Sequence, residues 1–345
     1  MIRTGGAYRA VEFTAGGQLE VRITPADVGK RVSVRRLTGS SDAGGKFTDT
    51  VGVLTSWDDG VVLITRRGGE SVRIPERTLV AGKVVPAAPA RRRGPAASFE
   101  ELARVSARAW QPVESEALGE WRLRAAAGFT RRANSALPLG DPGRPLDEAL
   151  SAVRAWYAAR DLPAYLQTAT GAEGTQELLC ADLEERGWVR EVTARLYVGG
   201  LAPLGDLDAA VDRVRLSRSF DEAWLRRYNR AAVPGPHVRE VLAGGPSVWF
   251  ASVPGSGDSP AAAIGRCVVD GRWAGFMAVE VDPGHRRQGL ATAVMTALAR
   301  QALAEGASAA WLQVEDDNDG ARALYGGMGF AAHHAYHHYR YGATA

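Results

Sequence analysis

Residues suited to binding an anion gather in the loop 282–291. It reads Asp-Pro-Gly-His-Arg-Arg-Gln-Gly-Leu-Ala, with Arg286, Arg287 and Gly289 at its centre. Gly289 lets a ligand approach the backbone closely, and the first turn of a following helix offers unpaired N–H groups and partial positive charge. We therefore expect this loop to bind a pyrophosphate group. The alternative is an ordinary strand-to-helix turn with two solvated arginines, because short motifs give false matches.

For the loop to bind an anion in this way, a strand must end before it and a helix must begin after it. Val279 and Val281 alternate with Glu280, which is typical of a short strand. After Gly289, apolar residues recur at helical spacing, and Gly306 lies where a C-terminal glycine cap belongs. The sequence therefore predicts a strand, a turn and a helix in that order.

A second segment, 309–330, repeats the order of strand and helix. Its first six residues predict a strand, which the acidic run 315–319 ends. Three apolar residues then fall on one face of a short helix: Ala321, Leu324 and Met328. Tyr325 lies on the flank of this helix, and a Gly-Phe pair follows it.

Both segments resemble the GNAT acetyltransferase superfamily. The motif Arg286-x-x-Gly289-x-Ala291 is similar to that family's pyrophosphate loop. The motif Asn318-x-x-Ala321-x-x-Leu324-Tyr325-x-x-x-Gly329-Phe330 is similar to its second cofactor motif. The resemblance implies an α/β (α+β) fold with a mixed central sheet flanked by helices, and acetyl-CoA as the co-substrate.

The resemblance also implies roles for individual residues. The strand edge at 279–281 would bind the pantetheine arm, and backbone amides from Arg286 to Thr292 would hold the pyrophosphate. Asn318 would contact the pantetheine, and Tyr325 would protonate the departing thiolate, a form of help worth about 10²–10⁴-fold in rate. The alternative for Tyr325 is a helix tyrosine packed at the edge of the core. The implied cofactor-binding residues are Val279, Glu280, Val281, Arg286, Arg287, Gln288, Gly289, Leu290, Ala291, Thr292, Asn318 and Tyr325.

The general base is not assigned by these motifs. Three positions that match the family's usual bases do not titrate usefully here: Gly275, Met277 and Gln313. Glu280 is the nearest carboxylate and the candidate catalytic residue beside Tyr325, although its side chain could point away from the substrate. The carboxylates of 315–317 are interpreted as a solvated strand end rather than a catalytic cluster. Water or a group from another domain could relay the proton instead.

Four histidines near the end of the chain raise the question of a metal site: His333, His334, His337 and His338. Neither cysteine nor an acidic residue is interleaved with them, and metal sites need three or four convergent ligands. We interpret the segment as an aromatic-rich closing strand and expect no metal. Cys180 and Cys267 lie in separate apolar segments and are expected to be reduced core residues.

The composition of the chain sets its class. At 345 residues the expectation is two or three domains. The sequence starts without the apolar core of a signal peptide, and no run approaches the ~18 apolar residues of a membrane span. We therefore expect a cytoplasmic protein without a membrane partner. Abundant Arg, Ala and Gly are typical of GC-rich bacteria.

Residues 1–93 are predicted to form a small basic, SH3-like β-barrel, with a Pro/Ala/Arg linker at about 86–95. Short strands are expected at 31–37, 48–56, 61–65, 70–74 and 83–86, with hairpin turns at 58–60 and 67–69. This segment has sixteen Lys and Arg against nine Asp and Glu, a net charge of +7. An acidic partner or nucleic acid is the candidate ligand of such a surface. A solvated surface on a packing module is the alternative.

The remaining chain is predicted to hold two GNAT-like halves in tandem. Residues 96–200 lack a glycine at the helix start and an Asn/Tyr pair, so they form the degenerate half. Residues 201–345 form the catalytic half. Paired arginines at 122–124 and 131–132 could bind an acidic or carboxylate-bearing acceptor, or could be solvated on an edge strand. The layout is similar to actinobacterial histone-acetyltransferase-like proteins.

The predicted function is transfer of an acetyl group from acetyl-CoA to a primary amine by direct attack in a ternary complex. Two acceptors stay open: a protein lysine or N-terminus, and a small amine held between the two halves. The alternative is a non-catalytic acyl-CoA sensor that binds nucleic acid or protein through its N-terminal module.

Overall fold

The structure is a computed structural model that describes residues 20–38, 46–86, 94–228, 235–257 and 259–342. The chain forms two compact units. The first comprises residues 1–90 and 169–186, and the second comprises residues 91–168 and 187–345.

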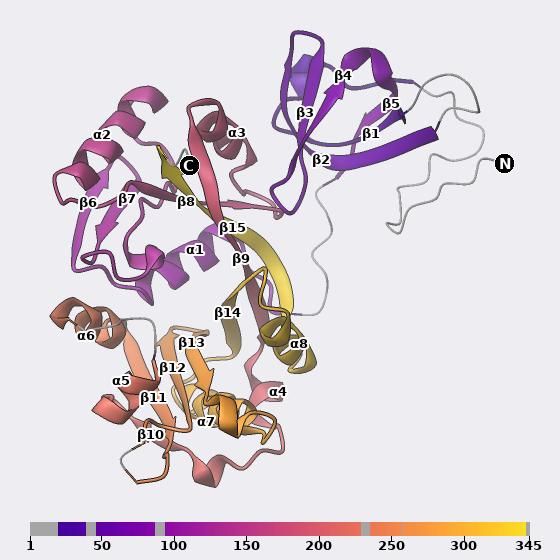
Figure 1. Ribbon diagram of the computed structural model, residues 1–345. Coiled ribbons are helices and arrows are strands. Elements are labelled where there is room, and N and C mark those ends of the chain that lie inside the picture. Colours follow the sequence, from indigo (N-terminus) through magenta and orange to yellow (C-terminus); the bar gives the residue numbers. More distant parts are fainter. Residues whose placement is uncertain (1–19, 39–45, 87–93, 229–234, 258, 343–345) are drawn as a thin grey trace. The chain divides into compact units, whose positions relative to one another are not determined.

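The first unit contains a five-stranded antiparallel sheet (Figure 1) in the order β4-β3-β2-β1-β5. The strands are β1 (Arg31–Thr38), β2 (Lys46–Asp58), β3 (Val61–Thr65), β4 (Ser71–Pro75) and β5 (Leu79–Val84). Asp59 and Gly60 both have positive φ, as the tight turn between β2 and β3 requires. The order leaves β4 and β5 as edge strands, and an SH3-like closure stays a prediction.

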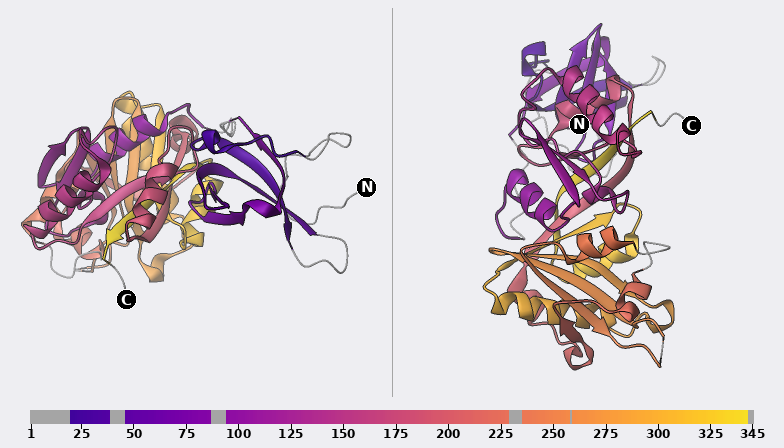
Figure 2. Two further views of the ribbon diagram at one scale, coloured as in Figure 1. Left: turned by 90° about the horizontal axis from the view of Figure 1, so that it is seen from above. Right: turned by 90° about the vertical axis from the view of Figure 1, so that its left-hand side faces the viewer.

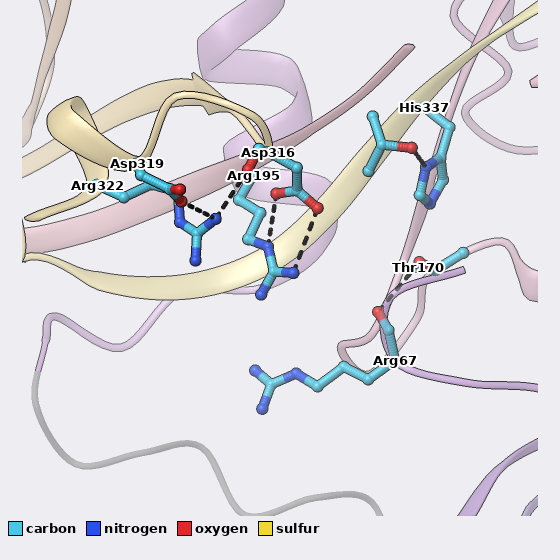
Figure 3. A network of polar contacts seen from close by, with 8 residues as sticks. Arg67, Thr170, Arg195, Asp316, Asp319, Arg322 and His337 are labelled. Carbon is cyan, nitrogen blue, oxygen red and sulfur yellow. Dashed lines mark hydrogen bonds and ion pairs between the residues drawn. The ribbon is translucent and has the colours of Figure 1, made fainter. Parts of the chain in front are cut away.

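The helix α3 (Glu177–Glu185) belongs to the same unit. Thr170, just before it, donates a hydrogen bond of 3.3 Å to the backbone carbonyl of Arg67 in the β3–β4 turn, as Figure 3 shows. Leu178 of α3 lies 3.5 Å from the position that a Cβ on Gly29 would occupy. A segment from the middle of the sequence therefore packs with the N-terminal sheet.

The second unit is built on an eight-stranded mixed sheet in the order β10-β11-β12-β13-β14-β9-β15-β8. Its strands are β8 (Tyr165–Thr170), β9 (Trp188–Gly200), β10 (Arg215–Ser217), β11 (Ser247–Val253), β12 (Ala263–Asp270), β13 (Trp273–Val281), β14 (Ala309–Glu315) and β15 (Ala331–Tyr341). A separate hairpin joins β6 (Glu114–Leu118) and β7 (Trp121–Ala125). The expected mixed sheet flanked by helices is confirmed.

Side chains alternate along β12 between two apolar layers. Ile264 and Val268 pack with α1 (Phe99–Arg108), α5 (Glu222–Arg227) and α6 (Pro236–Ala243) on one face. Cys267 and Val269 pack with α4 (Leu201–Gly205) and α7 (Leu290–Ala304) on the other face. Figure 2 shows this sheet from two further sides. The remaining helices are α2 (Leu146–Ala158) and α8 (Asp319–Gly327).

The strand β9 joins the two halves of this unit. It pairs antiparallel with β14, where Leu196 lies opposite Gln313, and with β15, where Thr193 lies opposite His337. A strand from the middle of the sequence thus lies between two strands of the C-terminal region. Strands from residues 165–200 and strands from residues 215–341 therefore share one sheet.

Candidate active site between β13 and β14

The site lies where two parallel strands separate. Pairing of β13 with β14 runs from Trp273 to Phe276 and ends there, although both strands continue. Ala278 has φ of 53°, and the pairing of β13 with β12 shifts register between Ile264 and Arg266. An extra residue of this kind is a β-bulge, which bends the strand. The bulge at Ala278 therefore turns β13 away from β14 and opens a wedge.

A pocket of about 120 Å³ occupies this wedge. Three of the predicted cofactor residues line it: Val279, Asn318 and Tyr325. Three other lining residues lie outside the two cofactor motifs, namely Trp110, Arg132 and Tyr228. No local signal marked Trp110 or Tyr228, because only the tertiary fold brings them to the wedge. Arg132 belongs to the arginine pair 131–132 that the sequence offered as a site for an acidic acceptor.

The loop before α7 has the geometry of an anion site. Gly289 caps α7 with φ of 75°, and Arg287 has φ of 60°. No atom lies within 4 Å of a Cβ built on Gly289, so the backbone there is open. Two left-handed residues and a helix N-terminus direct several N–H groups to one place. Leu290 is buried in the core, so only its backbone can serve a ligand.

Asp282 holds this loop in shape. Its carboxylate accepts a hydrogen bond of 2.8 Å from the Gly284 N–H, contacts His285, and pairs with Arg227 at 2.5 Å. These hydrogen bonds, with that from His285 the largest cause, hold the pKa of Asp282 below its ordinary value. The other predicted loop residues lie on this turn or the first turn of α7: Arg286, Gln288, Ala291 and Thr292.

Tyr325 and Asn318 lie on the short helix α8. The Tyr325 ring is half-buried and packs edge-on against Phe330, with ring centroids 6.1 Å apart. Asn318 is the N-cap of α8, and its Oδ1 accepts a hydrogen bond of 3.0 Å from the Ala321 N–H. This cap fixes the helix that presents Tyr325 to the pocket.

The two candidate carboxylates lie in different places. Glu280 lies on β13 opposite Ile264 of β12. Neither Glu280 nor its neighbour Val281 is among the residues that line the pocket. Glu315, the last residue of β14, does line it. The catalytic role of Glu280 stays a prediction, whereas Glu315 supplies the carboxylate of the pocket itself.

The acidic residues after Glu315 have structural roles. Asp316 forms an ion pair with Arg195 at 2.7 and 3.3 Å, and its backbone carbonyl accepts a hydrogen bond of 2.8 Å from Arg322. Asp319 also pairs with Arg322 at 3.1 Å (Figure 3). Glu315 therefore differs from its neighbours, because two basic side chains fix the segment that follows it.

A second pocket of about 200 Å³ adjoins the first, since Arg132, Tyr228 and Glu315 line both. Its other lining residues are Phe129, Thr130, Arg131, Val192, Tyr336 and His338. Phe129, Thr130 and Arg131 follow β7, Val192 lies on β9, and the other two residues lie on β15. Residues that lie far apart in the sequence of the second unit thus build this pocket jointly.

The C-terminal histidines lie in β15. His337 Nδ1 is 2.9 Å from Thr193 Oγ1 (Figure 3), and burial lowers the pKa of both His334 and His337 to about 3. Within the described residues, no three His, Cys, Asp or Glu side chains are grouped as metal ligands would be. Cys180 and Cys267 are buried free thiols, and burial raises the pKa of Cys267.

Comparison with known proteins decides the family. The family model described as "Probable histone acetyltransferase Rv0428c C-terminal" matches residues 96–341. The "Probable histone acetyltransferase Rv0428c" of Mycobacterium tuberculosis (strain ATCC 25618 / H37Rv) is 30% identical over 322 residues, which cover 91% of this chain and 94% of that protein. The chain belongs to this acetyltransferase family. The resemblance to GNAT acetyltransferases is confirmed.

One solved structure supports the fold of this family member. A GCN5-related N-acetyltransferase from Kribbella flavida has a TM-score of 0.52 at 19% identity, covering 72% of this chain and 98% of that one. The protein is an acyltransferase of the GNAT type, which implies use of an acyl-CoA. No helix in the described part of the chain is long and apolar enough to cross a membrane.

Proposed function

We propose that this protein transfers the acetyl group of acetyl-CoA to a primary amine within a ternary complex. One observation carries the proposal: Glu315 and Tyr325 line the same pocket, in the wedge opened by the bulge at Ala278. The open turn at Gly289 fits the pyrophosphate of such a donor. The bound donor supplies a thioester to this pocket, and the residues of the chain supply orientation and proton transfer.

Each residue has a defined task in the reaction. Glu315 takes the proton of the acceptor ammonium, which leaves a neutral amine. Backbone N–H groups of β13 beyond Phe276, where pairing with β14 has ended, polarise the carbonyl. As the C–N bond forms and the C–S bond breaks, Tyr325 gives its proton to the thiolate. The proton that the new amide nitrogen loses restores the Tyr325 hydroxyl, and Glu315 releases its own proton to solvent. No acyl-enzyme is required, since neither cysteine lines the pocket.

The acceptor is either a protein amine or a small amine. The name of the mycobacterial relative suggests a histone, and the basic N-terminal segment was predicted to bind an acidic partner or nucleic acid. The chief support for a non-catalytic sensor is the lack of a general base in the sequence motifs. Glu315 removes that support, so an enzyme is the better account.

Thiol release tests this function. Purified protein is mixed with acetyl-CoA and a panel of primary amines, and free CoA is followed with a thiol reagent. Release that depends on both the amine and Glu315 is expected. Tight binding of acetyl-CoA without release for any amine would contradict the enzyme and favour the sensor.

A further inference from the structure

We infer that the second pocket selects an acceptor that carries an anionic group, such as a carboxylate or phosphate, besides its primary amine. This inference rests on the proposed function and adds the substrate class. It is carried by the charges of the pocket, beginning with Arg132.

Arg132 is a half-buried cation without a carboxylate partner among the described residues. Its Nε and Nη2 donate hydrogen bonds of 3.0 and 2.6 Å to the Tyr336 hydroxyl, and its guanidinium lies 5.7 Å from that ring and 5.8 Å from the Trp110 ring. These contacts fix the guanidinium without neutralising it. Withdrawing an unpaired charge from water is costly, so a bound anion would be strongly favoured here.

Other groups around the pocket add positive potential. Arg131 lines it and pairs with Glu191 at 3.1 Å. Arg124 is fully buried and hydrogen-bonded to Ser135 and Gln167, which are neutral. Burial and the nearby Arg132, Arg124 and Arg131 hold the pKa of His338 well below its ordinary value, so the imidazole is neutral. An anion entering this pocket therefore meets the cationic side chains of Arg131 and Arg132, and His338 contributes no charge.

Glu315 supplies the complementary end of the pocket. It is exposed, and within the described residues it has no ion-pair partner. A molecule with an ammonium and an anion can therefore place its ammonium at Glu315 and its anion at Arg132. Glu315 also lines the first pocket, in the wedge, where the thioester of the donor is proposed to lie. The amine at Glu315 then lies beside the acyl donor.

The small volume of the second pocket and the positive charge of its lining both disfavour a basic peptide as the acceptor. At about 200 Å³ the pocket is smaller than the roughly 300–1,000 Å³ of pockets for drug-sized ligands, so it fits a short molecule or one side chain. A lysine flanked by further Lys and Arg residues would bring cations towards Arg132. A small anionic amine satisfies both constraints.

The test compares matched amines by calorimetric titration in the presence of saturating CoA. The probes are 4-aminobutyrate against butylamine, and phosphoethanolamine against ethanolamine. The anionic member of at least one pair should bind about tenfold more tightly, since hydrogen bonds to charged groups are the stronger ones. The pair that shows the preference identifies carboxylate or phosphate as the group bound.

Two variants test whether Arg132 causes the tighter binding of the anionic amines. Arg132→Gln should erase it, whereas Arg144→Gln, which removes an exposed arginine outside both pockets, should keep it. The inference fails if no probe binds, if both members of each pair bind alike, or if the preference survives Arg132→Gln. It also fails if Arg132→Gln weakens acetyl-CoA binding and leaves amine binding unchanged.

Turnover separates this inference from the proposed function. Acetylation of neutral and anionic amines with equal kcat/KM would overturn the anionic class and leave the acetyltransferase intact. Selective binding of the anionic amines with no acetylation would overturn the proposed function and leave the pocket assignment intact.

Discussion

At the level of single residues, Glu315 is set apart from the acidic run that follows it. It borders both pockets, whereas Asp316 is held by Arg195 and Arg322. A carboxylate at this boundary can take a proton from an amine in one pocket while the other holds the thioester. The sequence indicated this run but favoured a solvated strand end, because the contacts that distinguish its members come from β9 and α8.

The substitution Glu315→Gln tests this assignment. It preserves the shape of the side chain and removes the base, so kcat/KM for the amine should fall about 10²–10⁴-fold. Acetyl-CoA affinity should stay unchanged in a calorimetric titration. Asp317→Asn, an exposed neighbour outside both pockets, serves as the control and should leave kcat/KM near wild type. Equal losses in the two variants would contradict a specific role for Glu315.

The substitution Tyr325→Phe tests the acid. The ring and its edge-on contact with Phe330 are retained, so the fold should not change. Steady-state turnover should fall because the thiolate leaves without a proton, whereas acetyl-CoA affinity should change little. Wild-type turnover would show that Tyr325 is only a packing residue at the edge of the core.

At the level of elements, local patterns predicted the regular structure well and the irregular structure poorly. The helix expected after Gly289 begins at Leu290, and the helix that carries Tyr325 begins after Asn318. Nothing in the run around Ala278 marked a bulge, because its apolar alternation is that of a regular strand. The wedge therefore could not be predicted from residue order, although the residues flanking it could.

The turn before α7 gives a prediction with a matched control. Gly289 and Gly306 both have positive φ, 75° and 90°, and both face open space, one at each end of α7. Changing either to Ala should cost about 1–2 kcal/mol of stability through backbone strain alone. Only Gly289→Ala should also raise the KM for acetyl-CoA, because it distorts the N–H groups at the helix start. Equal KM values in the two variants would argue against the pyrophosphate site.

At the level of the whole molecule, residues 96–200 contribute to both units. Their β9 lies in the large sheet between β14 and β15, whereas α3 packs with the N-terminal sheet. The sequence suggested a second GNAT-like half from its order of strand and helix. It could not show that the two predicted halves share one sheet, because strand order depends on contacts far apart in the sequence. For the same reason the sequence did not connect Arg132 with Tyr336 or with Glu315, although it offered the arginine pair 131–132 as a site for an acidic acceptor.

Buried histidines make the stability of the second unit depend on pH. Burial lowers the folded-state pKa of His334 and His337 to about 3, against about 6.5 in the unfolded chain. Between these values the unfolded chain binds more protons, so stability falls as pH drops through the unfolded pKa. For each of these histidines, the free energy of unfolding should fall by about 1.4 kcal/mol when the pH is lowered from 7.5 to 5.5.

Chemical denaturation at the two pH values measures this effect, and most carboxylates stay ionised over that range. His337→Gln should reduce the difference in unfolding free energy between the two pH values by the contribution of one histidine. An unfolding free energy at pH 5.5 equal to or above that at pH 7.5 would contradict the burial of neutral imidazoles in β15.

The central claim is that the wedge between β13 and β14, with the loop at Gly289, binds acetyl-CoA. Calorimetric titration of the purified protein with acetyl-CoA tests this claim most directly. We predict one micromolar site per chain, lost when Arg286→Ala and Gly289→Ala are combined. If the wild type does not bind acetyl-CoA, or if the double variant binds it equally well, the donor site is not where the structure indicates.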